Sequence, residues 1–124
     1  MLILIAGPYR SGTDDDPAKM AANLKRLEDV SWPLFKAGHL PMIGEWVALP
    51  LWRAAGGGQV GDALYDAIFH PAAGRLLRHA EAVLRLPGAS AGADNDVRIA
   101  RERGIPVYFS LEDVPGCVPT ALPA

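Results

Sequence analysis

The sequence holds a single cysteine, a formal net charge of only −2 and no apolar run long enough to cross a bilayer. Cys117 therefore has no partner for an internal disulfide, and without a CxxC motif or a Cys/His cluster no metal site is predicted. The lack of a basic excess argues against a nucleic-acid polymer as partner, because such polymers bind basic patches. A small nucleotide remains a suitable ligand, since a few local donors bind one phosphate. We expect no metal, no cofactor and no membrane partner.

Two common phosphate-binding motifs are also missing. The turn at residues 7–13 has Thr13 where a P-loop needs a lysine after its second glycine. The dipeptide Pro8-Tyr9 after Gly7 excludes the GxGxxG dinucleotide fingerprint. The apolar segment 1–6 before this turn lacks a basic leader and is too short to span a membrane, so it predicts a buried strand. We expect a cytoplasmic chain.

Half of the 124 residues are apolar, as in ordinary globular proteins, and the pattern predicts one domain over residues 1–124 with a proline-rich tail at 115–124. Apolar runs predict strands at 1–6, 39–43, 82–86 and 105–109. Helical spacing predicts helices at 18–37, at 62–69 with a further piece to 79, and at 93–103, followed by a last turn at 111–114. This alternation is typical of an α/β fold. We expect a flavodoxin-like three-layer sandwich, with a parallel sheet of four to five strands and helices on both faces.

Prolines and acidic residues predict where the helices begin and break. The run of three aspartates at 14–16 before Pro17 fits an acidic N-cap followed by proline at the first helical position. Pro33 predicts a kink or an interruption near Trp32. The pair His70-Pro71 predicts a break between two helical pieces, and His70 is expected to be a surface or core histidine, because no partner stands at ligand spacing.

Three predicted turns, at 7–13, 44–52 and 87–96, follow the carboxyl ends of strands and would meet at one edge of the sheet. Residues 44–52 are expected to form a loop in which Trp46 either packs on the sheet or stacks on a planar base. Small residues and a helix start at 87–96 favour an anion. Carboxylates beside an anion site suggest glycosyl chemistry, in which a carboxylate attacks an anomeric carbon. The polar and aromatic residues of this rim are Tyr9, Arg10, Ser11, Glu45, Trp46, Ser90, Asp94, Asn95 and Asp96.

Two of these stretches resemble motifs of the nucleoside 2-deoxyribosyltransferase superfamily, which includes small enzymes that hydrolyse the N-glycosidic bond of nucleotides. Ile5-Ala6-Gly7-Pro8-Tyr9 is similar to the first strand of that family and its Ala-Gly-Pro loop, which ends in tyrosine or phenylalanine. The stretch from Leu86 to Ala100 is similar to the second motif, a turn with Ser-x-Gly-x-x-x-Glu that leads into a helix. The resemblance covers most of the chain in element order, but motif-specific positions are a minority.

The resemblance implies a role for individual residues. Asp96 stands where the family has its nucleophilic glutamate. Ser90 stands where nucleotide-hydrolysing members bind the 5′-phosphate, with Gly92 and backbone N–H groups beside it. Tyr9 lies in the loop that lines the sugar and orients the nucleophile. The remaining substrate contacts would come from Gly7, Arg10, Ser11 and Asn95.

The second acid of the family cannot be assigned by the resemblance alone. Glu45 is our candidate for the acid that assists the leaving base, with Asp62 and Asp66 as alternatives, and Trp46 would stack on that base. The resemblance also implies a homo-oligomer, because family members often complete the pocket from a neighbouring subunit.

The chain departs from the family pattern at the nucleophile, because Asp96 is one methylene shorter than glutamate. A displacement of ~1 Å can cost about a hundredfold in rate. The shorter side chain therefore leaves three alternatives: the backbone approaches the substrate more closely, the substrate differs, or catalysis is lost. Two functional hypotheses follow. The first is an enzyme that cleaves or transfers the sugar of a (deoxy)nucleoside or its 5′-monophosphate. The alternative is a nucleotide-binding or sensing module of the same fold with impaired catalysis.

Overall fold

A four-stranded parallel sheet forms the middle layer of the molecule. The computed structural model describes residues 1–117 and contains the strands β1 (Leu2–Ala6), β2 (Leu40–Ile43), β3 (Ala82–Arg85) and β4 (Val107–Tyr108). They pair in the order β2-β1-β3-β4, and every pairing is parallel. Ile5 of β1 lies opposite both Ile43 of β2 and Leu84 of β3, so these three strands end at a common edge. This order is that of flavodoxin-like sheets, and the predicted fold class is confirmed.

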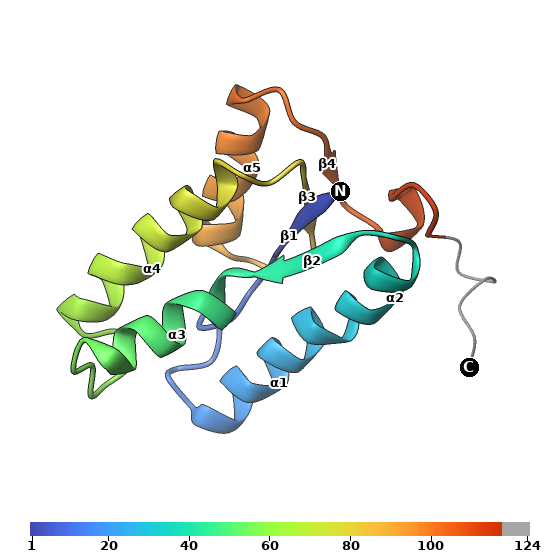
Figure 1. Cartoon of the computed structure of the whole chain (residues 1–124). Helices are drawn as coiled ribbons and strands as arrows, with labels where there is room; N and C mark the ends of the chain where they lie inside the picture. The colour runs from blue at the N-terminus through green and yellow to red at the C-terminus, as the bar shows by residue number, and fades with distance from the viewer. Residues whose placement is uncertain (118–124) are drawn as a thin grey trace.

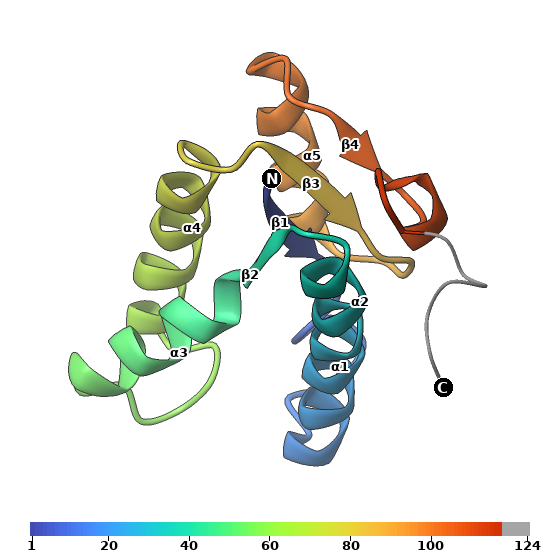
Figure 2. The same cartoon turned by 45° about the vertical axis from the view of Figure 1, so that its right-hand side comes forward.

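Helices cover both faces of the sheet. They are α1 (Pro17–Asp29), α2 (Ser31–Lys36), α3 (Gly44–Ala54), α4 (Ala63–Leu77) and α5 (Ala91–Glu102), followed by a short 3₁₀ turn at Leu111–Asp113. In Figures 1 and 2, α1 and α2 lie on one side of the strands, and α4 and α5 lie on the other. Helix α3 follows β2 directly and packs along α4 at the edge of the sheet.

The two cores follow from the alternation of side chains along β1. Ile3 and Ile5 point to one face, where they pack with Leu27 of α1 and Leu34 of α2. Leu4 and Ala6 point to the other face, where the buried residues of the helical layer and its connections are Leu77, Ala80, Ala93 and Ala100. A strand that is apolar at every position therefore serves both cores, as expected for a parallel sheet covered on both sides.

The start of α1 confirms the predicted acidic cap. The side chain of Asp16 accepts a hydrogen bond from the backbone N–H of Ala18 at 3.1 Å, and Pro17 occupies the first helical position. The break that Pro33 predicts is also present, but it lies at Val30 rather than near Trp32. Proline lacks the N–H for a helical bond and is tolerated in a first turn, so a new helix begins shortly before Pro33.

Residues 44–52 form the greater part of helix α3, and the prediction of a loop there is wrong. Ala48 and Trp52 are buried one turn apart, so packing of this face holds the segment helical. Pro50 is exposed, and its missing N–H leaves a carbonyl without a helical partner at Trp46, a residue that is itself exposed to water. The helix therefore continues through Pro50, because packing against the neighbouring elements supports its other face.

Helix α4 is continuous from Ala63 to Leu77, and the predicted break at His70-Pro71 is wrong. The side chain of Asp62 caps its N-terminus by accepting from the N–H of Tyr65 at 2.7 Å. Pro71 is exposed, and the carbonyl that it leaves unpaired belongs to the exposed residue Ala67, where water can bind it. The helix therefore presents one uninterrupted face to the rest of the molecule.

Within residues 1–117, no helix is long and apolar enough to cross a membrane. The last turn at Leu111–Asp113 agrees with the predicted turn at 111–114. Val114 and Cys117 are buried in the core beside α2, so the first part of the predicted tail belongs to the packed domain. Residues 118–124 of that tail lie outside the described residues.

Candidate functional site

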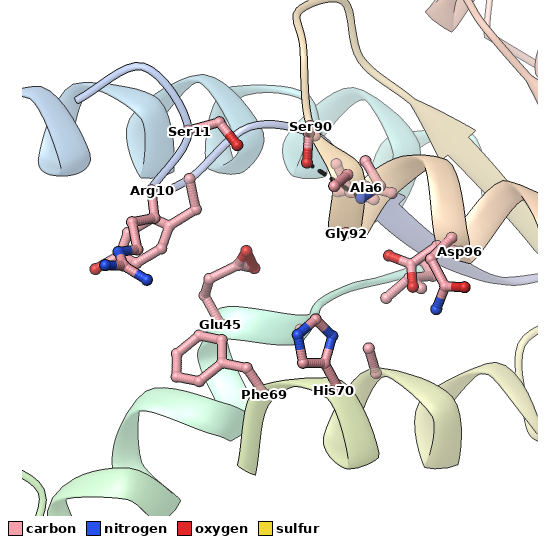
Figure 3. A pocket seen from close by; sticks show the side chains of 18 of the residues that line it. Ala6, Arg10, Ser11, Glu45, Phe69, His70, Ser90, Gly92 and Asp96 are labelled. Atoms are coloured by element: carbon pink, nitrogen blue, oxygen red, sulfur yellow. Dashed lines mark hydrogen bonds between the residues drawn. The ribbon is translucent and has the colours of Figure 1, made fainter. Parts of the chain in front are cut away.

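A cavity of about 320 Å³ opens at the edge of the sheet where the strands end (Figure 3). This volume is within the range of small-molecule pockets, about 300–1,000 Å³. Its walls come from the loop after β1, the first turn of α3, the face of α4 and the start of α5. Of the polar and aromatic residues predicted for this rim, Trp46 and Asp94 do not line the cavity. The predicted site residues that do line it are Gly7, Tyr9, Arg10, Ser11, Glu45, Ser90, Gly92, Asn95 and Asp96.

Glu45 is the second residue of α3, which begins at Gly44 directly after the last residue of β2. Its carboxyl group lies in the middle of the view in Figure 3, between the serines above it and α4 below it. Burial raises the pKa of Glu45 from 4.5 to about 7, although a hydrogen bond to its own backbone opposes this effect. At neutral pH this group can therefore hold a proton and give it up, as a general acid requires.

Asp96 reaches the same cavity from the second turn of α5. Burial raises the pKa of Asp96 from 3.8 to about 7, and the charge of Glu45 adds to the effect. The guanidinium of Arg85 acts in the opposite direction. Asp96 and Glu45 are therefore coupled, so that ionisation of one group disfavours ionisation of the other.

Arg85 is a cation at the end of the central strand β3, and only 8% of it is exposed. It pairs with Asp94 at 2.9 Å and donates a second hydrogen bond to the carbonyl of Leu86. Asp94 does not line the cavity, which corrects its predicted place on the rim. Successive helical residues are about 100° apart, so Asp94 and Asp96 face in different directions and have different partners.

The start of α5 provides the donors expected for an anion. The Ser90 hydroxyl caps the helix by accepting from the N–H of Ala93 at 3.1 Å, and its own hydrogen remains available to donate. The first-turn N–H groups of a helix have no intrahelical partner and favour negative charge. Gly92 in this turn lines the cavity without a side chain, and nothing lies within 4 Å of the place where a Cβ would be.

Tyr9 lines the cavity from the loop after β1, and the amide of Asn23 in α1 donates to its backbone carbonyl at 2.7 Å. Burial raises the pKa of Tyr9 above 10.0, and the charge of Glu45 adds to this, against the opposing charge of Arg53. The tyrosine hydroxyl therefore stays protonated at neutral pH and can donate to a sugar or to a carboxylate.

Arg10 is fixed at one side of the cavity. It forms two bonds with Asp15, at 2.6 and 3.2 Å, and its guanidinium lies over the ring of Tyr65 at 5.6 Å. The backbone of Gly61 packs so closely that an added Cβ would lie within 2.1 Å of the guanidinium. Figure 3 shows Arg10 on the far side of Glu45 from Asp96.

The predicted aromatic wall at Trp46 is wrong, because Trp46 does not line the cavity. Its indole N–H donates to Glu28 of α1 at 2.7 Å. In a helix, Trp46 lies about 100° around the axis from Glu45, and here its side chain is directed to α1 instead of the cavity. Phe69 of α4 lines the cavity instead, with its ring stacked on Tyr65 at a centroid distance of 3.8 Å.

Helix α4 contributes residues that sequence reasoning missed or did not place. Asp66, Phe69, His70 and Ala73 follow the spacing i, i+3, i+4, i+7 and all line the cavity. This periodicity is visible in the sequence, but a break at His70-Pro71 would separate these residues into two helical pieces. The other candidate acid, Asp62, does not line the cavity, because its carboxylate accepts from Tyr65 and Trp52, and these bonds hold the pKa of Asp62 below its usual value.

Comparison with protein-family models and with curated proteins gives no match for this chain. In the part of the chain that the structure describes, no group of three or more His, Cys, Asp or Glu side chains is arranged to hold a metal ion.

Proposed function

We propose that this protein is an enzyme that cleaves the N-glycosidic bond of a (deoxy)nucleoside 5′-monophosphate, with Asp96 as nucleophile and Glu45 as general acid. The proposal extends the resemblance to the nucleoside 2-deoxyribosyltransferase superfamily. One observation carries it: two half-buried carboxyl groups on separate helices, Glu45 and Asp96, face one small cavity, and each has a pKa raised to about 7. Perturbed carboxyl pairs of this kind are typical of catalytic sites that need one acid and one base or nucleophile.

The surroundings of the two carboxyl groups support this division of roles. Burial raises the pKa of both groups, the charge of Glu45 adds to the rise at Asp96, and both values come to about 7, so at neutral pH one group can be ionised while the other holds a proton. Two charges act on Asp96: that of Glu45 favours its protonated form, and that of Arg85 favours its ionised form. We assign Asp96 as the nucleophile, because it stands where the similar family has its nucleophilic glutamate and Arg85 stabilises its charge, and we assign Glu45 as the group that supplies the proton.

In the first step, a carboxylate oxygen of Asp96 attacks the anomeric carbon. The bond from this carbon to the base nitrogen breaks, its electron pair goes to the base, and the base takes the proton of Glu45. In the second step, water attacks the anomeric carbon of the sugar–Asp96 ester. Ionised Glu45 accepts a proton from the water, and Asp96 leaves as a carboxylate. Another base in place of water would give sugar transfer.

The preference for a monophosphate rests on the start of α5. Ser90 has a hydroxyl hydrogen to donate, and the free N–H groups of the first turn lie beside Gly92, where a phosphate can approach the backbone. Ser11 lines the same part of the cavity, near Ser90 in Figure 3. A phosphate held there would place the sugar toward Glu45 and Asp96.

The test is release of free base from a panel of nucleosides and their 5′-monophosphates, followed by chromatography. We expect the wild type to release base faster from monophosphates than from nucleosides. Glu45→Gln should lower the rate by about 10²–10⁴-fold, the usual contribution of a general acid, and Asp96→Asn should lower it at least as much. Glu102→Gln is the matched control, because this exposed acid at the far end of α5 pairs with Arg98 at 2.7 Å and lies outside the cavity.

Two outcomes would contradict the proposal. Turnover by Asp96→Asn at the wild-type rate would remove the nucleophile assignment. Thermal stabilisation by monophosphates without release of base would support the alternative function, a nucleotide-binding module with impaired catalysis, which the shorter side chain at Asp96 favours.

A further inference from the structure

The face of α4 that lines the cavity carries two polar side chains that the proposed chemistry does not use. Asp66 and His70 stand one turn apart and flank the turn that holds Phe69. Neither Asp66 nor His70 makes a side-chain hydrogen bond or a salt bridge within residues 1–117. The neighbouring cation, Arg10, is bound through both Nε and a terminal nitrogen to Asp15. Asp66 therefore faces the cavity with its hydrogen-bonding capacity free.

The position of this face decides which part of a substrate it meets. In Figure 3, Ser11 and Ser90 lie on one side of Glu45, while Phe69 and His70 lie on the other. A nucleotide whose phosphate occupies the donors at the start of α5 would place its sugar beside Glu45. Its base would then extend toward α4, where Phe69 lines the cavity with its ring stacked on Tyr65 and offers an aromatic contact for a planar base.

Asp66 and His70 offer specific hydrogen-bond acceptors and donors, which an apolar cavity wall would not. An ionised aspartate only accepts hydrogen bonds, and a neutral histidine has one donor and one acceptor nitrogen. A base that presents an amino group can donate to Asp66, whereas a carbonyl at the same place would put two acceptors against each other. Uncompensated pairs of this kind are costly, since the partner group loses its hydrogen bond to water.

We infer that Asp66, with His70, makes the site selective for bases that carry an exocyclic amino group over bases that carry a carbonyl at the same position. The inference rests on the function proposed above and adds a specificity determinant to it. Asp66 is assigned a role in recognising the base and no role in the bond cleavage.

Two matched pairs of nucleotides test this selectivity. Cytosine and uracil nucleotides differ by an amino group against a carbonyl on the same ring, and adenine and hypoxanthine nucleotides differ in the same way. The kcat/KM ratio is measured within each pair, in the sugar series that the enzyme cleaves. We expect the wild type to favour the amino base by about tenfold, the effect of one hydrogen bond to a charged group at a partly solvated site.

Asp66→Asn is the decisive variant, because its amide can donate as well as accept and so removes the discrimination. Both ratios should then fall to near one, while Glu102→Gln keeps the wild-type ratios. Asp66 is exposed on a capped helix, so the variant should keep its fold, and a thermal melt checks this. Unchanged ratios in Asp66→Asn, or a wild-type preference for the carbonyl bases, would overturn the inference.

A binding measurement separates this inference from the proposed function. Dissociation constants for the same nucleotide pairs are measured by calorimetry on Asp96→Asn, which is expected to bind without cleaving, and on the double variant with Asp66→Asn. Discrimination in binding that is lost in the double variant supports the inference, even if the wild type releases no base. Absence of base release would contradict the proposed hydrolysis alone. Equal binding of both members of each pair by Asp96→Asn would overturn the inference.

Discussion

Replacing Asp96 by asparagine should stabilise the folded protein at pH 8 and leave its stability unchanged at pH 4. The folded chain raises the pKa of Asp96 from 3.8 to about 7, so the folded state keeps a proton that the unfolded chain releases near pH 4. Between these two values the folded state binds more protons, and its stability falls as the pH rises. Above pH 7 the folded state holds an ionised carboxylate in the cavity, and this lowers its stability by the full amount. Asparagine is uncharged and avoids this loss of stability.

The size of the expected stabilisation follows from the shift in the pKa of Asp96. Each pKa unit corresponds to about 1.4 kcal/mol, so a change from 3.8 to about 7 amounts to about 4 kcal/mol for a fully sealed group. Asp96 is half-buried and lines an open cavity, and solvent screening lowers the expected gain to about 2 kcal/mol. For a domain of this size, that gain corresponds to a rise in Tm of about 5–10 °C.

The assay is thermal unfolding followed by circular dichroism at pH 4 and pH 8, with no ligand present. Asp29→Asn is a suitable control, because that exposed carboxylate pairs only with Lys25, at 3.0 Å. A stabilisation of Asp96→Asn that is equal at both pH values would show that packing and not charge is responsible. A variant less stable than the wild type at pH 8 would refute the reasoning outright.

Three further perturbations test other parts of the site. Glu45→Gln removes the charge that raises the pKa of Asp96, so the midpoint of the Asp96 carboxyl titration, followed by NMR, should move to lower pH; an unchanged midpoint would contradict the coupling. Arg85→Met removes the charge that lowers the same pKa, so the acid limb of base release should move to higher pH, whereas movement to lower pH would exclude this role. Ser90→Ala removes the N-cap of α5 and should lower the free energy of unfolding by about 1 kcal/mol in a denaturant titration. The same variant should raise KM for monophosphates more than for nucleosides, and an equal rise for both would argue against a phosphate at this turn.

The fold could be predicted because the strands carry a strong signal. The apolar run at Leu2–Ala6 serves two cores at once, and a strand of that kind belongs in a covered parallel sheet. Parallel strands then require their carboxyl ends to share one edge, so Glu45 and Asp96 could be expected to meet although they are far apart in sequence. Neither step needs knowledge of side-chain packing.

The remaining features depend on tertiary packing that the sequence does not display locally. Pro71 predicts a break, and Pro50 also lacks a helical N–H, but each proline is exposed, and the helices that contain them continue because packing supports their other faces. A loop at 44–52 would have allowed Trp46 to reach the site, whereas helix α3 directs it away. A break at His70-Pro71 would have divided the face of α4 that supplies Phe69, so this face could not be expected from the sequence.

The most direct test of the central claim is to trap the sugar on the enzyme. The protein is mixed with a reactive nucleoside 5′-monophosphate, quenched in acid within milliseconds to seconds, digested and examined by mass spectrometry. The proposed mechanism predicts a peptide that carries one sugar phosphate as an ester on Asp96, and the loss of that adduct in Asp96→Asn. Base release without an adduct at any time point, or an adduct on another residue, would contradict the assignment of Asp96 as the nucleophile.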